Sequence, residues 1–151
     1  HRQLGESAVA RRHFEAAAKL ARECGRLPLE VLASFQLGRL ELDSGSAAAA
    51  REHFDAACTV AVGSGNLSAT LDALAGFAWV EWREGARRRS LTLARVVHSH
   101  PATTPGSRTW ASELLALIEE PSAGADLDPE QVAMGDSVTR ALSLIHASGR
   151  E

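Results

Sequence analysis

Apolar residues along this chain recur every three or four positions, and short polar stretches that contain glycine separate one apolar segment from the next. That period is the period of an amphipathic α-helix, and a glycine after each segment suits the left-handed conformation in which many helices end. The pattern therefore predicts a series of helices joined by short connections. They are Glu6 to Cys24, Pro28 to Asp43, Ser46 to Ser64, Ser68 to Glu84, Ala86 to Ser99 and Ser107 to Glu119.

One part of the chain is repeated. GESAVARRHFEAAAKLARECG, residues 5–25, aligns without gaps on GSAAAAREHFDAACTVAVGSG, residues 45–65, which gives a period of 40 residues (45 minus 5). A more divergent third copy starts at Gly85, and a second kind of segment begins at Leu27 and again at Leu67. Each unit therefore holds two different helices, and we expect an all-α array of antiparallel helix hairpins.

Small and aromatic residues stand at matching places in these units. They are Gly38 and Ala78 in the first helix, then Ala50 and Ser90, Phe54 and Ala94, and Ala57 and Val97 after the turn. Their spacings over residues 5–120 resemble the tetratricopeptide repeat, and the resemblance implies a right-handed superhelical array, an α-solenoid. A unit of 40 residues is longer than the ~34 usual in that family, so each helix is expected to carry about one extra turn.

The last helix is predicted after the longest linker. Asp128 suits an N-cap and Pro129 suits the first helical position, so a helix is expected from there to about Ala147, about the seventh of the chain. We expect it to cap the array by folding back on it. The expected organisation is 1–120 as the repeats and 121–151 as the linker and capping helix of the same domain.

The first unit is incomplete in this sequence. Gly5 matches the turn glycines of the later copies, so the chain is expected to start in the second helix of a hairpin. Because the end of a helical array needs a polar cap, this start predicts a piece of a larger protein. The third unit, RSLTLARVVHSHPATTPGSRTWASELLALIEE, also resembles the C-terminal tetratricopeptide regions of large bacterial signal-transducing ATPases and LuxR-type regulators. That resemblance implies a partner-docking or sensing role.

Composition narrows the function classes. A formal net charge of -3 and a pI near 6.1 leave no excess of Lys and Arg for direct nucleic-acid binding. No apolar run reaches the ~20 residues that a membrane helix needs, and the two cysteines, Cys24 and Cys58, are best explained as packing residues in a reducing cytoplasm. No nucleotide-binding, hydrolase or zinc-protease motif occurs. We therefore expect no enzyme activity and no cofactor.

A groove for a protein or peptide partner is predicted where the first helices of successive units face the same side. Two tryptophans at i and i+3, together with arginine, are residue types that often dominate binding energy. The alternative is that Trp79 or Trp82 packs in the core. The predicted groove residues are Phe35, Gln36, Arg39, Leu42, Asp72, Gly76, Trp79, Trp82 and Arg83.

Other candidate groups have simpler explanations. His98 and His100 lack further ligands at a suitable spacing for zinc, so no metal site is predicted. The run from Arg87 to Arg89 suits either an acidic partner or a solvated helix face, and the second is the more common.

Three hypotheses follow. The first is a binding module for a peptide, a helix or another domain of its own chain. The second is a small-molecule sensor, which needs an enclosed cavity near Trp79 and Arg39. The third is a structural element that associates with itself through its exposed repeat end.

Overall fold

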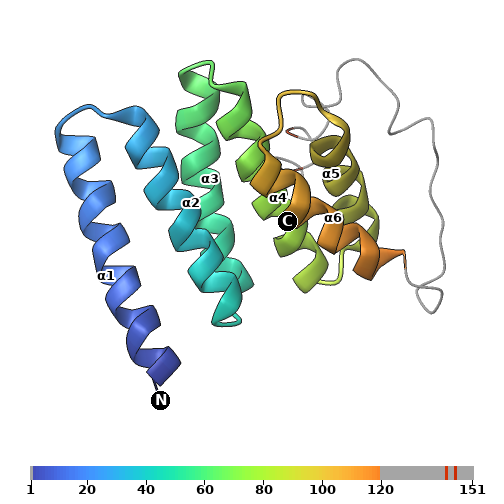
Figure 1. The fold of residues 1–151 in the computed structure, drawn as a ribbon, viewed down its shortest axis with the longest axis horizontal. Helices are drawn as coiled ribbons and strands as arrows, with labels where there is room; N and C mark the ends of the chain where they lie inside the picture. The colour runs from blue at the N-terminus through green and yellow to red at the C-terminus, as the bar shows by residue number, and fades with distance from the viewer. Residues whose placement is uncertain (1, 120–141, 143–144, 146–151) are drawn as a thin grey trace.

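The computed structural model describes residues 2–119, 142 and 145, and over this part of the chain it contains α-helices and no strand. The helices stand side by side and run alternately up and down (Figure 1). The predicted all-α class is confirmed. The helices are α1 (Arg2–Glu23), α2 (Leu27–Asp43), α3 (Ala47–Gly63), α4 (Leu67–Arg83), α5 (Arg87–Ser99) and α6 (Pro105–Ile118).

The boundaries of α2 to α6 fall within two residues of the sequence prediction. The start of α1 was predicted wrongly, because Gly5 lies inside the helix and not in a turn. A lone glycine costs a helix only about 1 kcal/mol, and the preceding Arg, Gln and Leu favour helix. The predicted helix from Asp128 to Ala147 lies outside the described residues except for Leu142 and Ile145, of which Ile145 is buried in the core.

Four of the connections share one geometry. Each contains a glycine with positive φ, and the two residues that end the turn donate their backbone N–H groups to carbonyls of the preceding helix. This is the Schellman arrangement, in which only glycine adopts the left-handed conformation without a Cβ penalty. The glycines recur every 20 residues, at φ 68°, 87°, 70° and 83°, and they are Gly25, Gly45, Gly65 and Gly85.

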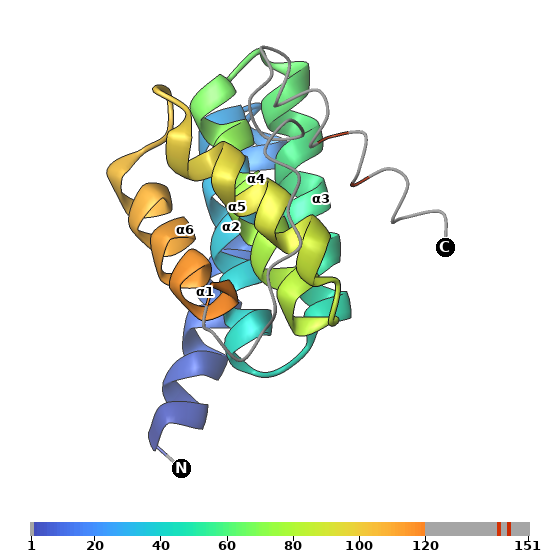
Figure 2. The same ribbon diagram turned by 90° about the vertical axis from the view of Figure 1, so that its right-hand side faces the viewer.

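The helices pack in chain order, and alternate helices also meet. Each helix from α1 to α5 contacts the next, while α4 additionally contacts both α2 and α6. Figure 2 shows α6 on one side of this packing and α3 on the other. The helices α2, α4 and α6 therefore share one side of the molecule, which is the side on which the groove was predicted.

Phe54 of α3 is the centre of the core. Its side chain is fully buried, and its ring lies against two helical glycines, Gly38 of α2 and Gly76 of α4. A Cβ built on either glycine would come within 2.5 Å of the ring, so a larger residue at either position would displace it. The sequence pattern has a small residue, Gly38, in the first helix of the unit, and here its lack of a side chain leaves room for the Phe54 ring between two helix backbones.

Buried carboxylates recur with the same period as the turns. Glu41 and Glu81 are both buried, and each forms an ion pair with an arginine of the preceding helix, Arg11 and Arg51 respectively. The two arginines are 40 residues apart, as are the two glutamates. In the second pair Arg51 Nη2 lies 2.7 Å from Glu81 Oε1, and Arg89 approaches the other carboxylate oxygen at 3.3 Å. These pairs were not predicted from the sequence.

The two cysteines differ in exposure and predict a selective thiol reaction. Burial, with the charge of Asp55 as a lesser cause, raises the pKa of Cys58 to about 11, whereas Cys24 is exposed. At pH 8 only about one thousandth of Cys58 is thiolate, because its pKa is about three units higher. We expect a disulfide reagent to modify Cys24 quickly and Cys58 only after unfolding. Rapid modification of both thiols in native buffer would contradict this burial.

Candidate functional site

A cluster of aromatic rings lies where α2, α3, α4 and α6 meet. Phe35 contacts Phe54 and Trp110 with ring centroids 5.8 Å apart in each case, and Phe54 lies 6.2 Å from Phe77. Trp79 and Trp110 stack at 5.8 Å with their planes 19° apart. We call Phe35, Trp79 and Trp110, whose side chains are half-buried, the aromatic surface.

Trp110 of α6 organises this surface. Its backbone carbonyl accepts a hydrogen bond from Trp79 Nε1 at 3.2 Å, so the polar group of Trp79 is already satisfied within the chain. Its ring is stacked on Trp79 and lies edge-on to Phe35. Stacking and edge contacts of this kind contribute about 0.5 to 1.5 kcal/mol each beyond burial. The two helices α2 and α4 are therefore joined through one residue of α6.

Arg39 lies over the ring of Trp110. Its guanidinium carbon is 4.6 Å from the ring centroid, within the range of a cation–π contact, and the residue as a whole is exposed. An exposed contact of this type contributes about 0.5 to 1 kcal/mol. The arginine thus keeps a preferred position while most of its charge remains available to a partner.

The position of α6 follows from its own N-terminal residues. Thr104 caps the helix by accepting a hydrogen bond from the backbone N–H of Ser107, and Pro105 occupies the first turn. The hydroxyls of Thr104 and Ser107 both donate to Asp72 Oδ1 of α4, at 2.9 and 2.5 Å. These contacts fix the start of α6 on α4, and Trp110 follows one helical turn later on the same face.

The structure corrects two of the predicted groove residues. Leu42 and Gly76 are buried, Gly76 against the Phe54 ring, so neither lines an open surface. Asp72 is half-buried, and its carboxylate holds the start of α6. The prediction was wrong at Leu42 and Gly76 because helical spacing alone does not distinguish a residue that faces a groove from one that faces the next helix.

The other six predicted residues have accessible side chains. Phe35, Arg39 and Trp79 come together around Trp110. Of the rest, Gln36 and Trp82 are half-buried and Arg83 is exposed, with Trp82 packed at the margin of the core. Trp79 and Trp82 are therefore each partly in the core and partly on the surface.

Trp110 itself was missed by sequence analysis. The groove was projected from two first helices, α2 and α4, although α6 occupies the same place in the alternation of helices. The residue 40 positions earlier is Thr70, so no repeated aromatic drew attention to it. Trp110 could have been predicted from the alternation of the helices, because α6 follows α4 in the same series as α4 follows α2.

The histidines and the arginine run have structural contacts. His100 Nδ1 accepts a hydrogen bond from the backbone N–H of Ala102, and within the described residues no group of three or more His, Cys, Asp or Glu could hold a metal. Arg87 donates to the carbonyl of Ile118 at 2.9 Å, which caps the end of α6, while Arg89 pairs with Glu81. Arg88 is exposed. The run therefore divides among three different environments.

Comparisons with known proteins give no assignment: no protein-family model, curated protein or solved structure matches this chain. Among the described helices, none combines the length and the apolar character needed to cross a bilayer.

Proposed function

We propose that this chain is a tetratricopeptide-like superhelical array that binds a peptide or a helix on the aromatic surface formed by α2, α4 and α6. In this proposal it is a protein-interaction or effector-sensing module of a larger bacterial regulatory protein, and it binds its partner without turnover. The observation that carries the proposal is the grouping of Phe35, Trp79 and Trp110, all half-buried, beneath the exposed Arg39.

The residue types on this surface favour binding of a polypeptide. Tryptophan and arginine are enriched among the residues that contribute most to protein interfaces, especially when they are already held in place before the partner arrives. Trp79 and Trp110 are held by stacking, and Arg39 is held over Trp110. Because Arg39 and Arg83 are exposed cations, the expected partner carries acidic side chains next to apolar ones.

The sensor hypothesis is less well supported by this geometry. It requires an enclosed cavity near Trp79 and Arg39, and both of these residues are already in contact with the ring of Trp110. Self-association is a third possibility, and a measurement of molecular mass in solution at several concentrations distinguishes it from the other two.

The proposal is tested by selecting peptides of about 15 residues from a displayed library against the folded protein. The selected peptides are expected to be acidic and apolar, and Arg39→Ala is expected to weaken their binding about tenfold, a change of roughly 1.4 kcal/mol. Fluorescence anisotropy of labelled peptides measures the affinity. Binding should also change the intrinsic emission of the protein, because two of its three tryptophans form the surface.

Arg88→Ala is the matched control, since it removes an exposed arginine from α5, away from the aromatic surface. Its affinity for the peptides should equal that of the unmodified protein. Peptides that bind Arg39→Ala and a Trp79→Phe variant as tightly as the original protein would exclude this surface as the binding site.

A further inference from the structure

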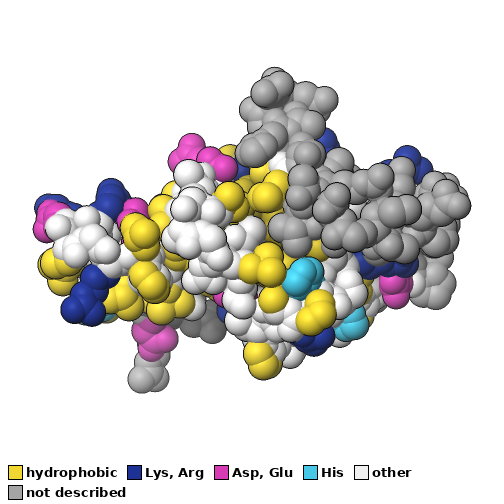
Figure 3. All heavy atoms as spheres, turned by 90° about the horizontal axis from the view of Figure 1, so that it is seen from above, with side chains coloured by type: hydrophobic (Ala, Val, Ile, Leu, Met, Phe, Trp, Pro, Cys, Tyr) yellow, Lys and Arg dark blue, Asp and Glu magenta, His cyan; other side chains and the backbone are white. Residues whose placement is uncertain are grey.

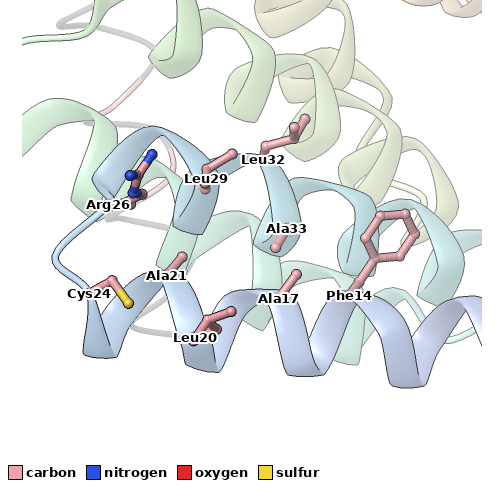
Figure 4. Close-up of a pocket in the computed structure, with 9 residues that line it drawn as sticks. All are labelled: Phe14, Ala17, Leu20, Ala21, Cys24, Arg26, Leu29, Leu32 and Ala33. Carbon is pink, nitrogen blue, oxygen red and sulfur yellow. The ribbon is translucent and has the colours of Figure 1, made fainter.

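An apolar groove lies between α1 and α2, apart from the aromatic surface (Figure 4). It has a volume of about 340 Å³, and Arg26 is the one charged residue that lines it. Leu20, Leu29 and Leu32 are exposed by 61%, 49% and 53%, which is unusual for leucines so close together. Figure 3 views the molecule from above, and hydrophobic side chains are visible at its left, where α1 and α2 lie. The other lining residues are Phe14, Ala17, Ala21, Cys24 and Ala33.

The same place in the next unit is filled. Phe14 corresponds to Phe54 and Ala17 to Ala57, each 40 residues later. Phe14 is half-buried and Ala17 is exposed, whereas Phe54 and Ala57 are 0% and 1% exposed. Phe54 is covered by Gly76 of α4, by Trp110 of α6 and by α2, which packs on α3. For α1, no described helix takes that position.

We propose that this groove binds an amphipathic helix that resembles α2, in the position that α2 occupies on α3. Two residues of α2 contact Phe54 and define what such a helix needs. The ring of Phe35 lies 5.8 Å from the Phe54 ring, and one turn later Gly38 leaves room for the Phe54 ring because it has no side chain. The occupant of the groove is therefore a helix with an aromatic residue followed three positions later by glycine. Its buried face is apolar, as the lining of the groove requires.

The third unit shows how size is matched at this contact. There the counterparts of Gly38 and Phe54 are Ala78 and Ala94, both fully buried. A large residue on one helix is thus opposite glycine, and a small residue is opposite alanine. Because α1 carries Phe14, glycine is the residue that its partner helix needs.

A synthetic peptide with the sequence of α2, residues 27–43, is the probe. It is expected to bind the full chain, and Leu20→Glu should weaken binding at least tenfold by placing a charge on the apolar wall. Val62→Glu is the control, because Val62 is also an exposed apolar residue, at 48%, and lies on α3 outside the groove. Bound peptide should also slow alkylation of Cys24, which lines the groove.

A size exchange makes the test specific. A peptide with alanine in place of Gly38 should bind the original protein more weakly than the unmodified peptide does, and the Phe14→Ala variant should reverse that order. Absence of peptide binding, or equal binding to Leu20→Glu and Val62→Glu, would overturn the proposal. Concentration-dependent association of the chain that Leu20→Glu abolishes would also overturn it, since the groove would then belong to a second copy.

Discussion

Replacing Phe54 by alanine is expected to lower the free energy of unfolding by about 3 to 5 kcal/mol, close to the whole stability of many small domains. The ring is fully buried and contacts rings or backbone from α2, α4 and α6. Its removal leaves a cavity that two glycines cannot fill. Urea denaturation followed by far-ultraviolet circular dichroism measures the effect. A loss below about 1 kcal/mol would show that the ring is not the centre of the core.

Gly38→Ala is the companion change. On an open helix face alanine would stabilise by up to about 1 kcal/mol, but here its Cβ would lie 2.5 Å from the Phe54 ring, and a net loss of about 1 to 3 kcal/mol is expected. Gly5→Ala is the matched control, since Gly5 is also helical and has open space around it. In the Phe54→Ala background the penalty of Gly38→Ala should disappear, as the alanine pair of the third unit indicates.

Replacing Arg51 by methionine is expected to destabilise the protein by about 3 kcal/mol. The carboxylate of Glu81 has a side-chain exposure of only 2%, and removing its closest cation leaves a buried charge with less compensation. Arg89 remains 3.3 Å from the carboxylate and limits the loss. The same denaturation measurement applies, and methionine retains the apolar stem that arginine packs along the helix.

Arg95→Met provides the comparison for this ion pair. Arg95 pairs with Glu119, whose side chain is 53% exposed, so the expected loss is below about 1 kcal/mol. Similar losses in the two variants would mean that burial of Glu81 does not matter. Arg11→Met, which removes the counterpart one repeat earlier, should fall nearer to Arg51→Met, because Glu41 is also largely buried.

The helices could be predicted because their pattern is local. Apolar spacing and turn glycines each act within a few residues, and they placed five helices to within two residues. Gly5 shows the limit of this approach. Its sequence context matches Gly45, but Gly45 ends a helix with positive φ while Gly5 continues one, because the turn depends on what packs on both sides of it.

The candidate site could be predicted only in part. Phe35, Arg39 and Trp79 were found because helical spacing brings them to one face. Trp110 was not found, since its place next to Trp79 depends on how Asp72 holds the start of α6, a contact between residues 32 to 35 positions apart. The buried pairs Arg51–Glu81 and Arg11–Glu41 were missed for a similar reason. Charged residues were assumed to face solvent, and the repeated spacing of both partners was the signal that would have found them.

The even spacing of the four turn glycines limits how this chain can change in length. The helices α2, α3 and α4 are each 17 residues long, and each is followed by the same turn. One residue inserted within α3 would rotate every later side chain by about 100° about the helix axis, moving Phe54 or its neighbours away from the glycines. Insertions should therefore be poorly tolerated within the evenly spaced part, from α2 to α4.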